Sequence, residues 1–139
     1  MPNHPTGVVH PDYRGRLAVR ENLDGITVLR NWIYATPNEG IFKKIISHLS
    51  FMVSAVLLGL PRLGPADVII VSSPNFLSAF SAYVISRVRH IPFVFEVRDL
   101  WPAAFVDLGV LTNPLLIQFL EFCEMFLYRR AALVATVTT

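Results

Sequence analysis

The chain has 139 residues, which is enough for one domain with its own hydrophobic core. Hydrophobic residues make up 53% of it and charged residues 16%, a balance that excludes an intrinsically disordered chain. Twelve Lys and Arg stand against ten Asp and Glu without a dense basic block, so we expect no nucleic-acid partner. The start, MPNHPTG, lacks the features of a signal peptide, and the single cysteine, Cys123, fits a reducing compartment. We therefore expect a cytoplasmic protein.

The N-terminal third gives mixed signals. Residues 1–24 are rich in proline, glycine and charge without hydrophobic periodicity, and this pattern predicts a loop. Asp24-Gly25 is a turn signal, and residues 26–34, ITVLRNWIY, predict a strand directly after it. A long apolar segment from Ile41 to Leu60 then predicts a helix that ends before Pro61.

The apolar part of this helix allows more than one environment. Residues 45–60, IISHLSFMVSAVLLGL, reach only the lower limit of a membrane-spanning helix and contain His48 and three serines. A helix that covers a sheet is the favoured interpretation, and a spanning helix is disfavoured. The adjacent Lys43 and Lys44 leave a third interpretation open, in which the helix lies at the interface of a membrane with anionic lipid.

The second half alternates short apolar runs with helical patterns. VIIVS at 68–72, FVFEV at 93–97 and ALVATVTT at 132–139 predict buried strands covered on both faces. Helices are predicted between them, over FLSAFSAYVISRVR at 76–89 and from Pro114, capped by Asn113, to about Arg130. This order predicts an α/β fold with a doubly wound, Rossmann-like parallel sheet. The residues of the last helix expected to face inward are Leu115, Phe119, Phe122, Cys123 and Phe126.

Polar residues follow two of these strands. In an open parallel sheet, ligands bind outside the carboxyl ends of the strands. The first strand leads into Ser72, Ser73 and Asn75, and the second ends with Glu96, followed by Arg98, Asp99 and Trp101. We expect the two loops to face one crevice, with Ser73 near Asp99. The residues that we expect to contact a ligand in this crevice are Ser73, Asn75, Glu96, Arg98, Asp99 and Trp101.

Structural interpretations of the same residues stay open. Ser-Ser-Pro-Asn at 72–75 is also a helix-capping sequence. Arg98 and Asp99 are equally compatible with an ion pair that braces the loop, with Trp101 as its lid. The sequence contains no dinucleotide-binding loop, no P-loop and no nucleophile elbow, and its four histidines lack the spacing of zinc ligands. No cofactor or metal is therefore predicted from the residues.

Several segments, read together, resemble a known family. They are PNHPTG, YRGR, DGITVLR, DVIIVSSP, PFVFEVRDLWP, LGVL and FLYRRAALVATVT. They are similar to bacterial family-4-type glycosyltransferases of surface polysaccharide and lipopolysaccharide synthesis, such as the colanic-acid and fucosamine-type enzymes. The resemblance implies a retaining GT-B enzyme with two Rossmann-like domains, which moves a hexosyl or amino sugar to a lipid-linked or polysaccharide acceptor. It also implies that residues 1–139 are an incomplete N-terminal acceptor domain, without its first strand–helix unit and without the domain that holds the nucleotide-sugar.

The resemblance also implies roles for the loop residues. Asp99 would orient an acceptor hydroxyl, and the leaving diphosphate rather than a protein nucleophile would help to deprotonate it. Arg98 stands where many relatives have histidine, so it would instead supply positive charge to an acceptor phosphate or to the donor. Ser73 and Asn75 would line the acceptor side, and Trp101 would stack on a sugar. The residues alone leave another class open, a non-enzymatic α/β module whose charged loop binds a protein or an anion.

Two further expectations follow from the resemblance. The nucleotide-sugar is a co-substrate rather than a cofactor, and the chain alone is expected to be inactive and marginally stable. The enzyme is expected in the cytoplasm or peripherally on the inner face of the cell membrane, in contact through the helix near Lys43 and Lys44.

Overall fold

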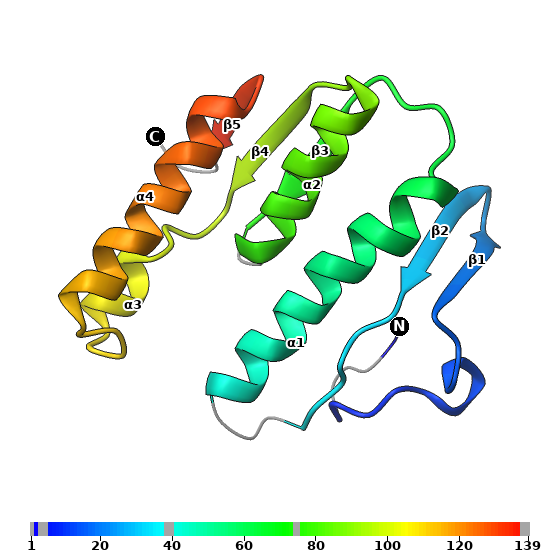
Figure 1. Ribbon diagram of the computed structural model, residues 1–139, viewed down its shortest axis with the longest axis horizontal. Helices are drawn as coiled ribbons and strands as arrows, with labels where there is room; N and C mark the ends of the chain where they lie inside the picture. The colour runs from blue at the N-terminus through cyan, green and yellow to red at the C-terminus, as the bar shows by residue number, and fades with distance from the viewer. Residues whose placement is uncertain (1, 3–5, 38–40, 74–75, 137–139) are drawn as a thin grey trace. The chain divides into compact units, whose positions relative to one another are not determined.

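The computed structural model describes residues 2, 6–37, 41–73 and 76–136 of the chain. Two compact units make up the structure, residues 1–65 and residues 66–139 (Figure 1). Each unit has its own sheet: a two-stranded antiparallel one in the first unit and a three-stranded parallel one in the second.

A β-hairpin organises the first unit. Strand β1 (Ala18–Leu23) pairs with β2 (Ile26–Asn31), and a 3₁₀ turn, η1 (Pro11–Tyr13), precedes them. Asp24 and Gly25 both have positive φ, 50° and 86°, as a two-residue type I′ turn requires. The predicted strand after the turn is confirmed, but the loop predicted for residues 1–24 is wrong over β1. That segment is polar and becomes a strand because the Asp-Gly turn folds it back onto β2.

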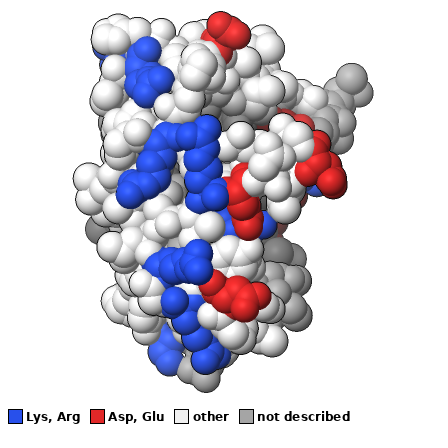
Figure 2. All heavy atoms as spheres, turned by 90° about the vertical axis from the view of Figure 1, so that its right-hand side faces the viewer, with Lys and Arg blue, Asp and Glu red and all other residues white. Residues whose placement is uncertain are grey.

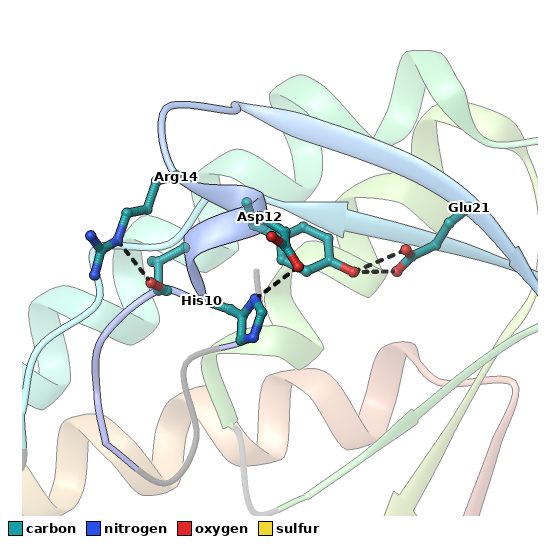
Figure 3. A network of polar contacts seen from close by, with 6 residues as sticks. His10, Asp12, Arg14 and Glu21 are labelled. Carbon is teal, nitrogen blue, oxygen red and sulfur yellow. Dashed lines mark hydrogen bonds and ion pairs between the residues drawn. The ribbon is translucent and has the colours of Figure 1, made fainter.

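A polar cluster fastens the N-terminal loop to the hairpin. The Tyr13 hydroxyl donates to Glu21 Oε2 at 3.0 Å (Figure 3), and Glu21 also forms an ion pair with Arg30. In the hairpin register Arg30 lies opposite Val19, so Glu21 is its diagonal neighbour on the same face. The Arg30 guanidinium lies 5.5 Å from the centre of the Tyr13 ring, which adds a cation–π contact. The hydrogen bond from Arg30 to Glu21 holds the pKa of the Glu21 carboxyl below its usual value.

The predicted long helix is confirmed, with an irregular C-terminal end. Helix α1 (Ile41–Ser54) continues into a π-helical turn, η2 (Ala55–Gly59), and a 3₁₀ turn, η3 (Leu60–Arg62). The helical path passes Pro61 because this residue lies in the first turn of η3, where no backbone N–H is needed. Gly59 lets η2 approach β2 closely, since a Cβ there would lie 2.9 Å from Asn31 Nδ2.

Helix α1 turns a serine-rich side towards the segment that follows β2. Ser50 Oγ accepts from the Tyr34 backbone N–H at 2.8 Å, and the Ser54 hydroxyl donates to the Trp32 carbonyl. The large apolar side chains of this helical segment are exposed instead: Phe42, Ile45, Ile46, Leu49, Val53 and Leu57. Within the described residues, Phe42–Arg62 is the one helical segment whose length and composition would suffice to cross a membrane, with a mean hydropathy of 1.5.

The second unit has the predicted α/β order. Its parallel strands β3 (Ile69–Ser72), β4 (Phe93–Val97) and β5 (Leu133–Thr136) lie in the order β3-β4-β5. Helix α2 (Phe76–Arg89) connects the first pair and α4 (Pro114–Arg130) the second, and both were predicted. Asn113 caps α4, because its Oδ1 accepts from the N–H groups of Leu115 and Leu116 at 3.0 and 3.2 Å. The short helix α3 (Ala103–Asp107), which follows the charged loop, was not predicted.

The core of this unit lies on one face of the sheet. The alternating Phe93, Phe95 and Val97 of β4 are buried and pack in one cluster with Ala79 of α2 and Leu127 of α4. Both helices contact this face and each other, because the Tyr83 and Phe126 rings meet edge to face at 5.1 Å.

The opposite face departs from the prediction that both faces are covered. Ile70 and Leu133 alternate with the core positions of their strands and are 69% and 60% exposed. That prediction is therefore wrong for these positions in the described structure, since α2 and α4 share one face.

The inward face predicted for α4 is partly wrong. Cys123 and Phe126 pack against the core as expected, and burial raises the pKa of the Cys123 thiol. Leu115, Phe119 and Phe122 are 60–76% exposed instead. The helix is apolar on more than one side, and the side that carries Leu120 and Leu127 packs on the sheet.

Candidate functional site

The ends of β3 and β4 bring the two predicted polar loops together. The strands are parallel and in register up to the pair Ser72 and Glu96. One residue later the Ser73 N–H donates to the Glu96 carbonyl at 2.9 Å, which extends the ladder past the strand end. The loops after both strands therefore start from the same edge of the sheet, as the sequence predicted.

The Ser73 side chain holds the charged loop in place. Ser73 is 3% exposed, and its Oγ accepts from the backbone N–H groups of Arg98 at 2.8 Å and Asp99 at 3.1 Å. The same hydroxyl lies 3.4 Å from the Asp99 carbonyl, towards which it donates. One buried hydroxyl thus satisfies two consecutive backbone donors of the charged loop. The predicted proximity of Ser73 and Asp99 is present, and a side chain-to-backbone contact produces it.

The charged side chains of this loop point to solvent. Arg98 and Asp99 are both exposed, and among the described residues neither takes part in an ion pair. The interpretation of these two residues as a bracing ion pair is therefore wrong. Ser73 supplies the brace through the backbone, which leaves a guanidinium and a carboxylate available at the rim.

Trp101 packs beside the loop and against the core. Its ring meets Phe105 of α3 edge to face at 5.3 Å, and the side chain is half-buried against the core cluster. Pro102, joined to it by a cis peptide bond, is buried. The structural interpretation of Trp101 as part of the loop's packing is supported, and its stacking on a sugar stays a prediction.

Two predicted site residues remain. Glu96 is half-buried and alternates with the buried Phe95 and Val97, so its side chain belongs to the opposite face of β4. Asn75 lies outside the described residues, and so does the predicted capping of α2 by the sequence at 72–75. The described residues contain no group of three or more His, Cys, Asp or Glu that could hold a metal ion.

The parallel sheet, with helices between its strands and polar residues at its strand ends, defines an α/β domain of the Rossmann-like class. A comparison with protein-family models gives the family: residues 4–139 match the glycosyl transferase 4-like domain. The chain belongs to this family, and it is thus a glycosyltransferase domain rather than an unrelated binding module. Searches of curated proteins and of solved structures found no match.

One feature of the site escaped the sequence-based prediction. The sequence placed Ser73 on the binding surface, whereas the structure directs its hydroxyl inward to the loop backbone. A serine after a strand is compatible with a cap, a ligand contact or a bridge to another loop. The signal available was that two consecutive N–H groups in a loop beside a buried strand need an acceptor.

Replacing Ser73 by Ala removes the acceptor of two backbone donors. We expect the Ser73→Ala variant to lose about 1–3 kcal/mol of unfolding free energy, because both N–H groups are then left unsatisfied. Denaturant unfolding of the chain measures this loss, and amide hydrogen exchange at Arg98 and Asp99 should become faster.

Ser72→Ala is the matched control, because its hydroxyl donates to the carbonyl of the adjacent Ser73 and, among the described residues, accepts from no backbone N–H group of another loop. Equal losses of unfolding free energy in the two variants, with unchanged exchange at Arg98 and Asp99, would contradict the bracing role.

Proposed function

We propose that this chain is the acceptor-side domain of a retaining GT-B glycosyltransferase. The enzyme would move a hexosyl or amino sugar from a nucleotide-sugar to a lipid-linked or polysaccharide acceptor in cell-surface polysaccharide synthesis. The observation that carries the proposal is the Ser73 contact, which fixes the backbone of two exposed charged residues at the strand-end rim of a glycosyltransferase-family domain. The nucleotide-sugar would be held mainly by a second domain outside residues 1–139, so the chain alone would be inactive, and no further cofactor is invoked.

Asp99 and Arg98 supply the chemistry in this proposal. The Asp99 carboxylate accepts a hydrogen bond from the acceptor hydroxyl and so orients the hydroxyl oxygen towards the anomeric carbon of the donor sugar. As the bond between this carbon and the diphosphate breaks, the departing diphosphate takes the hydroxyl proton. Arg98 is always charged, so it stabilises negative charge on an acceptor phosphate or on the departing diphosphate. Ser73 acts through the backbone and keeps both residues in position.

The other predicted site residues have supporting roles. Asn75, which lies outside the described residues, is proposed to bind the acceptor, and Glu96 contributes a polar group at the end of β4. Trp101 packs beside the loop, and its half-buried side chain would stack on a sugar.

Asp99→Asn tests the proposed function in the full-length enzyme. The amide keeps the size of the side chain but loses its negative charge, so it orients and polarises the acceptor hydroxyl poorly. We expect kcat for sugar transfer to fall by about 100-fold or more. The measurement is transfer from the nucleotide-sugar to the acceptor, with binding of both substrates followed separately.

Asp107→Asn is the control, because Asp107 is an exposed acid at the end of α3 in the same unit. Its transfer rate should stay within about twofold of wild type, as is usual for a surface substitution away from the site. An Asp99→Asn enzyme with a similar rate would remove Asp99 from the chemistry.

We also propose that the enzyme associates peripherally with the inner face of the cell membrane through α1. The observation that favours this is the exposed apolar stripe of α1, which begins at Phe42 and runs to Leu57 in η2, next to Lys43 and Lys44 in the first turn. An apolar face with lysines near one end suits the boundary between headgroups and acyl chains of anionic lipid.

Vesicle sedimentation tests this association. The Lys43→Gln/Lys44→Gln variant should bind phosphatidylglycerol vesicles more weakly at low salt, by about 1 kcal/mol for each lysine removed. Wild-type binding should decrease as salt rises. An Arg20→Gln/Arg87→Gln variant, which removes two exposed charges elsewhere, should bind like wild type. Sedimentation that does not depend on lipid charge would contradict the proposal.

A further inference from the structure

A groove in the first unit is lined by aromatic and basic side chains. Two adjoining hollows, of about 260 and 390 Å³, share Val9, Arg14 and Trp32 in their walls. Tyr13 and Arg16 line the first hollow, and Tyr34 lines the second. Trp32 and Tyr34 are 40% and 42% exposed, so their rings are accessible to a solute.

The walls of the groove are fixed by backbone contacts. The Trp32 N–H donates to the Leu17 carbonyl at 2.9 Å, and its own carbonyl accepts from Ser54 of α1. The Tyr34 N–H is held by Ser50, one turn earlier in the same helix. At the other wall Gly7 has φ +72°, and a Cβ there would lie 2.2 Å from the Thr36 carbonyl oxygen, so only glycine fits this close approach. The backbone that carries the two aromatic side chains is therefore fixed before any ligand binds.

The charged residues that line the groove are basic. The residues that line it include Arg14 and Arg16 and no Asp or Glu. The nearby carboxylates are engaged elsewhere: Asp12 lies 3.3 Å from His10 Nδ1, and Glu21 is bound by Tyr13 and Arg30. Figure 3 shows Arg14 directed away from Asp12 and Glu21; its Nε donates to the Val9 carbonyl at 3.3 Å.

The surrounding surface has the same sign. Residues 1–65 contain seven Lys and Arg against four Asp and Glu, whereas residues 66–139 contain five against six. Figure 2, which looks onto the side of β1 and β2, shows groups of Lys and Arg side chains alongside several Asp and Glu side chains on this face. An anion is therefore attracted to this unit in preference to the other.

We infer that this groove binds a saccharide that carries a phosphate or diphosphate group. The aromatic faces of Trp32 and Tyr34 suit the apolar face of a sugar ring, and Arg14 and Arg16 suit phosphate oxygens, to which guanidinium groups donate in pairs. The inference rests on the proposed function in one respect, the source of the ligand: in the proposed enzyme the phosphorylated saccharide would be part of the acceptor. All residues that line the groove belong to the first unit, whereas the residues of the strand-end rim belong to the second.

The positions of the two tryptophans make a direct test possible. Trp32 lines the groove, and Trp101 lies beside the rim loop in the other unit; they are the two tryptophans of the chain. A protein labelled with 5-fluorotryptophan gives one ¹⁹F NMR signal for each, assigned with Trp32→Phe. The probes are N-acetylglucosamine 1-phosphate, neutral N-acetylglucosamine, inorganic phosphate and phosphatidylglycerol vesicles.

N-acetylglucosamine 1-phosphate should shift the Trp32 signal in a saturable way and bind more tightly than either the neutral sugar or phosphate. Arg16→Gln should weaken this binding about tenfold, because a charge-assisted phosphate contact is lost. Arg20→Gln, an exposed arginine of β1 outside the lining, should bind within about twofold of wild type. An unchanged hairpin NMR spectrum in Arg16→Gln separates lost binding from lost folding.

Three results would overturn the inference. In the first, the sugar phosphate leaves the ¹⁹F signal of Trp32 unchanged, whether or not the signal of Trp101 shifts. A shift of the Trp101 signal alone would contradict this inference but not the proposed function. In the second, vesicles shift Trp32 and the sugar phosphate does not, which would assign the groove to lipid headgroups. In the third, Arg16→Gln and Arg20→Gln bind equally well.

Discussion

A single buried hydroxyl connects the two halves of the candidate site. Neighbouring parallel strands hold each other through their ladder, but beyond the last pair their loops separate unless another contact joins them. Ser73 supplies that contact by accepting from the N–H groups of both Arg98 and Asp99. The backbone of the charged loop is thereby fixed while its side chains remain in solvent. This is the arrangement that a site needs when charges must be in position before the substrate arrives.

The two units are stabilised in different ways. The second has an apolar core, in which Phe93, Phe95 and Leu127 are almost fully buried under α2 and α4. The first relies more on polar fastenings: the Tyr13–Glu21–Arg30 cluster across the hairpin and the serine hydroxyls of α1. Because α1 uses its serines towards the segment after β2, its large apolar residues stay exposed. The exposed stripe and the fixed backbone beneath the aromatic groove therefore have a common origin.

The sequence predicted the second unit well for reasons that can be named. Its strands are continuous apolar runs, and α4 begins at an Asn-Pro pair that both caps and starts a helix. Such signals are local and strong, so they survive without tertiary information. The hairpin strand β1 has no comparable signal, since its polar sequence becomes a strand only through pairing with β2. The face of α4 that packs was also beyond local reasoning, because more than one side of that helix is apolar.

For the candidate site, the sequence predicted the edge of the sheet and the proximity of its residues, but not the contacts. The strand-end rule places Ser73 and Asp99 at one rim. Whether a serine hydroxyl turns to a ligand or to a neighbouring loop depends on which backbone donors lie within reach, and this is a property of the folded chain. The same limit applies to Arg98 and Asp99, whose adjacency suggests an ion pair that the fold does not form.

The most direct test of this account is a double-mutant cycle between Ser73 and Asp99, measured by sugar transfer in the full-length enzyme. If Ser73 acts by holding Asp99 in position, Ser73→Ala will slow transfer in the wild-type background and have little further effect once Asp99 is Asn. If the two substitutions instead raise the activation free energy of transfer additively, Ser73 does not act through Asp99 and this account is contradicted.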